Sequence, residues 1–296
     1  MKVDRQKLAR FAELRLRAPG AATSLQQGDR RSRFLGRGLE FADYREYDPG
    51  DDIRLIDWTV YLRLNQVLVR QFNEERSLSI KICVDTSASM DFGRHRKADR
   101  AAQLAASVAT VALSHRDPVM LVCYGSDRTT VTAKGVNLDG MAEMLHVLEK
   151  VEPRGRGNAY AQLAAQLSGR TDRLFLISDL LAEDSEREQL LRLLAASSLH
   201  PVLLHVISQE ELAPDLTDVS RVVDSETGEE LVIEDGYSAA QKYADGVAAW
   251  LEAIETRCRT LGIQYLRLTD DDDLDEWIHG DLHRAKVVEH TAGGNQ

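Results

Sequence analysis

The chain has 296 residues, of which 37 are Lys or Arg and 48 are Asp or Glu, so its formal net charge is −11. Hydrophobic residues make up 43% and charged residues 29%, which excludes a disordered or fibrous chain. The acidic balance argues against general nucleic-acid binding, which needs a positive surface. The cysteines Cys83, Cys123 and Cys258 show no Cys-x-x-Cys spacing. They fit a reducing compartment better than a disulfide framework or a zinc knuckle.

The first thirty or so residues are predominantly basic. Leu8, Phe11, Leu14 and Leu16 suggest one amphipathic helix that ends at Pro19-Gly20. We therefore predict a basic N-terminal helix and loop over residues 1–32, with a solvated basic face favoured over contact with an anionic partner. No apolar export segment follows Met1. Residues 101–113 are too short and too polar for a bilayer span of about 20 residues, so we expect a cytoplasmic protein without a membrane span.

Residues 33–76 are dense in charged and aromatic residues and in turn signals. A strand is expected over residues 67–72, and we interpret the whole segment as a β-rich extension. The charges between Gly36 and Trp58 favour an ion-pair network that ties this extension to the core. The alternative is a protein-binding surface, because aromatic and Arg side chains are enriched at binding hot spots. Its anchors would be Tyr44, Arg45, Tyr47 and Trp58.

From residue 77 onward, short apolar runs alternate with helical patterns. The expected strands are residues 78–84, 119–124, 174–178, 202–207 and 263–268. The expected helices are residues 97–114, 138–150, 159–167, 185–196 and 239–261. Near-continuous apolar strands separated by helices predict an open, doubly wound, mostly parallel sheet over residues 77–290, an α/β fold with helices on both faces.

Four smaller features complete the predicted α/β domain. Residues 129–133 are expected to form an antiparallel edge strand, and residues 221–223 and 231–233 a hairpin. The four aspartates at 270–273 are interpreted as the start of a helix rather than a calcium site. His200 and His205 are expected to be structural. The tail, residues 291–296, is expected to be disordered.

The candidate chemistry lies where two of these strands end. Asp85, Ser87 and Ser89 follow the first strand, and Asp179 follows the strand at 174–178. Ligands of open α/β sheets bind outside the carboxyl ends of strands, and these oxygen donors suit Mg²⁺. Taken alone, the Asp-x-Ser-x-Ser turn is more often a helix cap, but a second carboxylate nearby favours a divalent cation. Asn158, which precedes a predicted helix, is a further candidate donor.

These residues resemble the metal-ion-dependent adhesion site of von Willebrand factor A-like domains. That site uses an Asp-x-Ser-x-Ser loop, a Thr from a second loop and an Asp from a third. Asp85, Ser87, Ser89 and Asp179 match the pattern, whereas Asn158 stands in the Thr position. The resemblance implies Mg²⁺ or Mn²⁺ as cofactor.

A wider set of motifs resembles the bacterial family known as domain of unknown function 58. The motifs are Gly36-Arg-Gly-Leu-Glu-Phe, Tyr44-Arg-Glu-Tyr, Pro49-Gly-Asp-Asp, Ile56-Asp-Trp, Asp85-Thr-Ser-Ala-Ser-Met and Ile177-Ser-Asp-Leu. This resemblance implies a von Willebrand A-like core, a MoxR-type AAA+ ATPase as partner, and a role in assembling or activating a client protein.

Three functional hypotheses follow. The first is a metal-ion-dependent protein-binding module without enzymatic activity, and the second is a metal-dependent hydrolase. Phosphotransfer of the haloacid-dehalogenase type is disfavoured because it needs a second Asp two residues after the first for acid–base catalysis, and Ser87 occupies that position. The third is a metal-free scaffold that binds partners through the surface between Gly36 and Trp58.

Overall fold

The computed structural model describes residues 1–17, 39–74, 77–126, 129–132, 134–155, 158–167, 171–214, 221–223, 230–232 and 236–291. The chain divides into two compact units, one formed by residues 1–19 and 78–296 and the other by residues 20–77. We call the first the α/β unit and the second the hairpin unit. A disordered tail was predicted for residues 291–296, of which residues 292–296 lie outside the described part of the chain.

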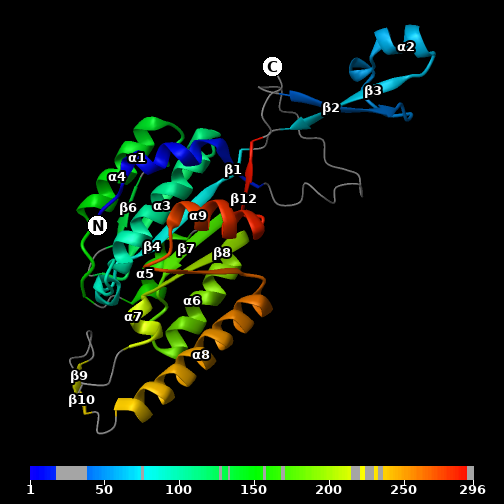
Figure 1. The fold of residues 1–296 in the computed structure, drawn as a ribbon. Coiled ribbons are helices and arrows are strands. Elements are labelled where there is room, and N and C mark those ends of the chain that lie inside the picture. The colour runs from blue at the N-terminus through cyan, green and yellow to red at the C-terminus, as the bar shows by residue number, and fades with distance from the viewer. Residues whose placement is uncertain are drawn as a thin grey trace. The chain divides into compact units, whose positions relative to one another are not determined.

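A six-stranded sheet forms the centre of the α/β unit, in the order β11-β8-β7-β4-β5-β6 (Figure 1). Its strands are β4 (Ile80–Asp85), β5 (Val119–Tyr124), β6 (Thr130–Val131), β7 (Thr171–Ser178), β8 (Ser198–Ile207) and β11 (Gln264–Thr269). All neighbours are parallel except β5 and β6. The predicted strands, including the antiparallel edge strand, are confirmed.

Helices cover both faces of this sheet (Figure 1). They are α3 (Lys97–Ser114), α4 (Leu138–Lys150), α5 (Ala159–Gln166), α6 (Asp184–Ser197), α7 (Gln209–Leu212), α8 (Gly236–Leu261) and α9 (Leu274–Trp277), followed by the π-helical turn η4 (Ile278–Leu282). Side chains of α3 and α4 belong to one apolar cluster and those of α5, α6 and α8 to another. The doubly wound α/β architecture is therefore confirmed, although the short helix α7 was not predicted.

Strand β4 shows why the sequence has nearly continuous apolar runs. Ile82 and Val84 point into the α3 cluster, whereas Cys83 between them belongs to the cluster on the opposite face. Successive side chains of a strand alternate between the two faces, so a strand covered on both sides needs apolar residues at every position. The strand leaves this environment at Asp85, its last residue.

The N-terminal segment corrects the prediction of a single helix. The chain forms α1 (Arg5–Leu8), the 3₁₀ helix η1 (Ala9–Glu13) and strand β1 (Leu14–Leu16), which pairs antiparallel with β12 (Val288–His290). Leu14 and Leu16 are buried on either side of an exposed Arg15, which is the period of a strand rather than a helix. Apolar side chains of this segment belong to the α3 cluster, so residues 1–17 are part of the α/β unit, not a separate domain.

The hairpin unit contains two antiparallel strands, β2 (Leu39–Glu46) and β3 (Leu68–Glu74). The predicted strand at 67–72 is thus confirmed as β3. Between the strands lie the 3₁₀ turn η2 (Ile53–Leu55) and helix α2 (Trp58–Leu64), which was not predicted. Asp57 caps α2, its Oδ1 accepting hydrogen bonds from the backbone N–H groups of Thr59 and Val60.

Two further predictions are met near the end of the chain. The expected hairpin forms antiparallel strands β9 (Arg221–Val223) and β10 (Glu230–Val232), although its turn, residues 224–229, lies outside the described part. Asp273 caps α9, as expected for the run of four aspartates. Within the described residues, no helix combines the length and the apolar character needed to cross a bilayer.

Candidate metal centre

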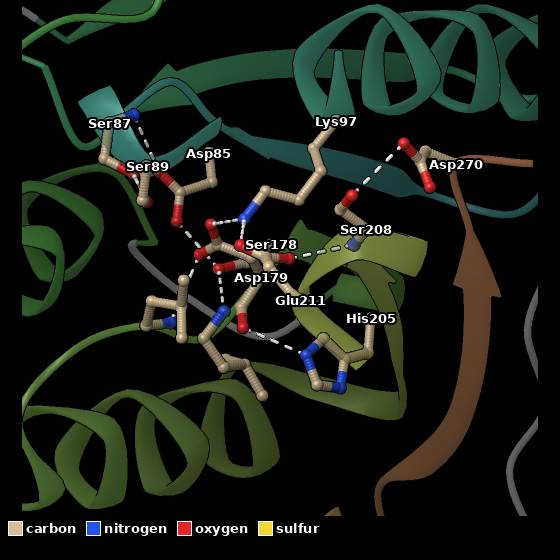
Figure 2. Close-up of polar contacts among 12 residues, drawn as sticks. Asp85, Ser87, Ser89, Lys97, Ser178, Asp179, His205, Ser208, Glu211 and Asp270 are labelled. Atoms are coloured by element: carbon tan, nitrogen blue, oxygen red, sulfur yellow. Dashed lines mark hydrogen bonds and ion pairs between the residues drawn. The ribbon is translucent and has the colours of Figure 1, made fainter. Parts of the chain in front are cut away.

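The two predicted carboxylates lie side by side at the carboxyl edge of the sheet (Figure 2). Asp85 ends β4 and Asp179 directly follows β7, and these strands are parallel neighbours in which Val84 pairs with Ile177. Both carboxylates are buried, with 7% of Asp85 and 2% of Asp179 exposed. The prediction that parallel strand ends bring the two residues together therefore holds.

Asp85 is fixed by two neutral donors. Its Oδ1 accepts the backbone N–H of Ser87 at 2.9 Å, and its Oδ2 accepts the hydroxyl of Ser178 at 2.7 Å. Burial, followed by the negative charge of Asp179, raises the pKa of Asp85 to about 6, because both effects disfavour the ionised form. Gly125 makes room for this carboxylate: its φ is +92°, and a Cβ there would lie 2.5 Å from Asp85 Oδ1.

The two serine hydroxyls of the motif meet each other rather than the backbone. Ser87 Oγ and Ser89 Oγ are 3.0 Å apart. Ser87 occupies the N-cap position of the 3₁₀ helix η3 (Ala88–Asp91), but its side chain makes no capping hydrogen bond to the described backbone. The capping interpretation of this turn therefore does not account for its hydroxyls. Asp85, Ser87, Ser178 and Asp179 line one small cavity of about 30 Å³, room for a single ion or water.

Asn158 has a different partner from the one predicted. Its Oδ1 accepts the backbone N–H of Ala161 at 2.6 Å and so caps α5, and the side chain is exposed. The neighbouring Ala159 lines the cavity, but Asn158 does not. An Asn directly before a helix satisfies one of the helix's unpaired N–H groups, and here capping takes the oxygen that was expected to bind metal.

We expect Asn158→Ala to lower the free energy of unfolding by about 1 kcal/mol, the usual cost of losing such a cap. Chemical denaturation followed by circular dichroism measures this change. Affinity for a divalent cation should be the same as in the wild type. A large loss of cation affinity with no change in stability would show that Asn158 is a ligand after all.

Sequence reasoning missed Lys97, the first residue of α3. Its side chain is fully buried (0% exposed), and Nζ lies 2.7 Å from Asp179 Oδ2 and within hydrogen-bond reach of Glu211 Oε1 (Figure 2). Burial by itself would lower the pKa of Lys97, but the charges of the two carboxylates outweigh it and raise the pKa. A signal was present: residues 101–113 of α3 contain no charged side chain, which is typical of a buried helix, and a lysine buried at the start of such a helix needs carboxylate partners.

Helix α7 holds Glu211 in place. Glu211 Oε2 accepts the backbone N–H of Ser208 at 2.8 Å, which completes a capping box at the start of α7. The buried Asp270 secures the same turn, because its Oδ1 accepts the backbone N–H of Gln209 at 2.8 Å. Burial raises the pKa of Glu211 although Lys97 opposes this shift.

His205 holds the backbone of Asp179, directly after β7, in agreement with its predicted structural role. Its Nε2 lies 2.9 Å from the carbonyl oxygen of Asp179, and its Nδ1 lies 2.8 Å from the hydroxyl of Tyr265. Burial lowers the pKa of His205 to about 4. The neutral ring can donate one hydrogen bond and accept another, so it can bridge these two oxygens and hold the chain after β7.

The predicted protein-binding residues lie in the hairpin unit. Tyr44 donates its hydroxyl to Asp57 at 2.8 Å, and Arg45 pairs with Asp51 at 2.8 Å. Trp58 is 59% exposed at the start of α2, and Tyr47 is partly buried. The ion pairs described here join residues of the hairpin unit to each other.

Comparison with known proteins identifies the family. The family described as "Protein of unknown function DUF58" matches residues 43–250. The chain belongs to this family. It is 28% identical over 284 residues to "Uncharacterized protein Rv1480" of Mycobacterium tuberculosis (strain ATCC 25618 / H37Rv), covering 92% of this chain and 87% of the relative. The same values apply to "Uncharacterized protein Mb1516" of Mycobacterium bovis (strain ATCC BAA-935 / AF2122/97).

Solved structures similar to this DUF58 protein include the conserved hypothetical protein BatB from Bacteroides thetaiotaomicron. They share 15% identity with a TM-score of 0.44, covering 71% of this chain and 98% of BatB. The VWA domain of SpRpn10 has 13% identity and a TM-score of 0.36, covering 67% of this chain and 91% of that domain. The six-stranded, mostly parallel sheet of this chain agrees with the von Willebrand A-like fold that its motifs implied.

The residues at the carboxyl edge of the sheet in this DUF58 protein include the oxygen donors that Mg²⁺ prefers. Among the described residues, no group of three or more His, Cys, Asp or Glu side chains is arranged to hold a metal ion. The cavity lining combines the carboxylates of Asp85 and Asp179 with Ser87 and Ser178. When ionised, Asp85, Asp179 and Glu211 carry three negative charges against the single charge of Lys97, and a hard cation offsets this excess. Asp85, Ser87 and Asp179 line the cavity that such an ion would occupy, and the Ser89 hydroxyl lies 3.0 Å from that of Ser87, whereas the exposed Asn158 does not line the cavity.

Proposed function

We propose that this protein is a Mg²⁺-dependent protein-binding module, with its site at Asp85, Ser87, Ser89 and Asp179. One observation carries the proposal: two buried carboxylates and two serines, Ser87 and Ser178, line a cavity of about 30 Å³ at the carboxyl edge of the sheet. Burying like charges together is costly unless a cation compensates them. Binding sites of open α/β sheets lie at this edge.

Each residue has a separate task in this proposal. Asp85 supplies the most fixed oxygen, because Ser178 and the Ser87 backbone orient its carboxylate. Ser87 and Ser89 would contribute hydroxyl oxygens to the ion, and Asp179 would supply the second carboxylate. Bound Mg²⁺ would offer an open coordination position that an acidic side chain of the partner fills, since hard cations accept carboxylate oxygens.

The resemblance noted above supplies the expected partners. We propose that the protein works with a MoxR-type AAA+ ATPase and that a client protein presents the acidic side chain. A cytoplasmic location belongs to the same proposal. It is supported by three cysteines, Cys83, Cys123 and Cys258, that are all free and buried, since cytosolic proteins rarely form disulfides.

Isothermal titration with Mg²⁺ and Mn²⁺ tests the metal site. We expect the wild-type protein to bind one ion and Asp85→Ala to lose binding by at least 100-fold, because the variant lacks the best-oriented charged donor. Asn158→Ala is the matched control and should bind as the wild type does. Absence of binding in the wild type, or unchanged binding in a folded Asp85→Ala protein, would defeat the proposal.

A second candidate surface lies in the hairpin unit, where large apolar side chains are exposed together. Leu62 is 83% exposed, and Ile53, Trp58 and Leu64 are also largely exposed on η2 and α2. Contiguous exposed apolar residues mark interaction sites. Binding of the ATPase that survives chelation but fails with Trp58→Ala would favour this surface and a metal-free scaffold.

The proposal contains no catalytic step. A screen with generic phosphate esters in the presence of Mg²⁺ tests this part against the hydrolase hypothesis. Turnover that disappears in Asp85→Asn would contradict the binding-module proposal and assign the edge to hydrolysis.

A further inference from the structure

The ammonium of Lys97 contacts one of the two proposed metal carboxylates. Asp85 is held by neutral donors, the Ser87 backbone and the Ser178 hydroxyl. Asp179 instead receives Lys97 Nζ on Oδ2 at 2.7 Å, while its Oδ1 accepts the Leu181 backbone N–H at 3.2 Å. A charge-assisted hydrogen bond is stronger than a neutral one, so Lys97 and a divalent ion compete for Asp179 in particular.

The other charged groups around the cavity have partners of their own. Arg187 lines the cavity, but its guanidinium donates to the carbonyl of Ala182 at 2.9 Å and pairs with Asp184. Glu186 also lines it and accepts the Ala159 backbone N–H at 2.7 Å. Lys97 is therefore the positive charge that acts directly on the metal carboxylates in the described structure.

We propose that Lys97 is the resident counter-ion of this edge: it holds Asp179 in the cation-free protein and retains only Glu211 when a divalent ion is bound. This inference rests on the proposed function. Two cations cannot both take Asp179 Oδ2 at close range without strong repulsion. Lys97 has an alternative partner at hand, because its Nζ already contacts Glu211 Oε1 (Figure 2).

The carboxylate of Glu211 is held in a fixed position beside the Lys97 ammonium. Its second oxygen is fixed by the Ser208 backbone, and α7 is anchored to Asp270. The Phe92 ring centre lies 5.9 Å from Lys97 Nζ, within the range of a cation–π contact. Lys97 can thus release Asp179 and remain buried beside Glu211 and Phe92.

Two consequences follow for variants without this charge. The metal-free protein should be destabilised, since removal of one partner leaves buried carboxylates without compensation. The affinity for Mg²⁺ and Mn²⁺ should rise at least tenfold, since no ammonium competes for Asp179. A merely structural role for Lys97 would lower stability but would not tighten cation binding.

Lys97→Met and the milder Lys97→Gln test the inference, with Mg²⁺ or Mn²⁺ alone as the probe in isothermal titration. Arg173→Met is the matched control, because Arg173 is a buried cation near the opposite end of β7. Its cation affinity should be unchanged, because the Arg173 guanidinium donates to the Arg17 carbonyl and not to the metal carboxylates. Urea denaturation in chelator gives the second readout. There Lys97→Met should lower the midpoint, and the double variant Lys97→Met/Asp179→Asn should recover at least half of the loss.

The outcomes separate this inference from the proposed function. Tenfold tighter binding by the Lys97 variants supports the inference. Binding by these variants without binding by the wild type also supports it, but contradicts the proposed function of the native protein. Equal affinity in wild type and variants overturns the inference and leaves the function standing. Absence of binding in all of them overturns both, and a double variant no more stable than Lys97→Met overturns the counter-ion role.

Discussion

Replacing Phe11 with alanine is expected to destabilise the α/β unit by about 3–5 kcal/mol, the cost of deleting a buried aromatic side chain. Phe11 lies in η1, is fully buried, and belongs to the same apolar cluster as α3. Its ring centre is 5.8 Å from that of His279 in the C-terminal part of the unit. The Phe11 side chain therefore connects the N-terminal segment both to the apolar cluster between α3 and the sheet and to η4 near the C-terminus. Urea denaturation followed by circular dichroism measures the loss.

The matched control is Arg10→Ala, one residue earlier. Arg10 is largely exposed and pairs with Asp275 at 2.6 Å, and such surface ion pairs contribute about 0–1 kcal/mol. A small effect of Arg10→Ala beside a large effect of Phe11→Ala would locate the stabilisation in the apolar contact. Equal small effects would mean that the apolar contacts of Phe11 contribute little to the stability of the α/β unit.

The difference between the predicted and observed N-terminal segment has a specific physical cause. Leu8 and Phe11 have helical spacing, and the two leucines that follow continue an apolar pattern that a helix can accommodate. The strand β1 exists because Leu14–Leu16 pairs with Val288–His290, more than 270 residues later in the chain. In a strand of three residues, the alternation of apolar and polar side chains is too short to be distinguished from a helical pattern. The periodicity of the sequence also does not reveal which distant segment pairs with it.

The elements of the sheet were predictable because their signals are local. Strand β5 and helices α3 and α4 have the bounds that were predicted. In each, the apolar pattern of the segment itself indicates both the type of element and its length. Helix α7 was missed because it has only four residues, too few to show an apolar period, although Ser208 and Glu211 form a capping box that marks its start.

The candidate site divides in the same way. Asp85 and Asp179 were found because each ends a recognisable strand, and topology then places parallel strand ends at one edge. Asn158 was expected to be a metal donor, whereas in the structure its Oδ1 caps α5, a role that the same position before a helix also suits. Lys97 and Glu211 are 114 residues apart in sequence, and no local pattern joins a lysine on a buried helix to a glutamate on an unpredicted one.

Asp57→Ala is expected to abolish the ordered structure of the hairpin unit while leaving the α/β unit folded. Asp57 is buried, and its Oδ2 accepts the Arg70 guanidinium at 2.9 Å and the Tyr44 hydroxyl at 2.8 Å. Its Oδ1 caps α2. One carboxylate thus links β2, β3 and α2, and a two-stranded hairpin is marginally stable without such support. Amide hydrogen exchange should show protection lost across residues 39–74 and retained in β4 and β7.

The same carboxylate gives the hairpin unit a pH dependence whose direction is fixed. The Arg70 guanidinium, followed by the Tyr44 hydroxyl, lowers the pKa of Asp57 well below its usual value. A lowered pKa stabilises the folded state above the unfolded pKa of about 4, and this contribution is lost as pH falls toward the folded value. Exchange protection of β2 and β3 should therefore persist at pH 5 and decline below about pH 4.

Asp48→Asn is the control for both measurements, because Asp48 is an exposed carboxylate that pairs with Arg45 at 3.2 Å. It should leave protection and its pH dependence unchanged, since exposed pairs contribute little. Trp58→Ala should also leave the unit folded, because the side chain is largely exposed. If Asp57→Ala keeps its protection, the hairpin unit is held by its strands alone. Because Trp58→Ala is expected to stay folded, a loss of partner binding in that variant would come from the missing surface side chain and not from unfolding of the hairpin unit.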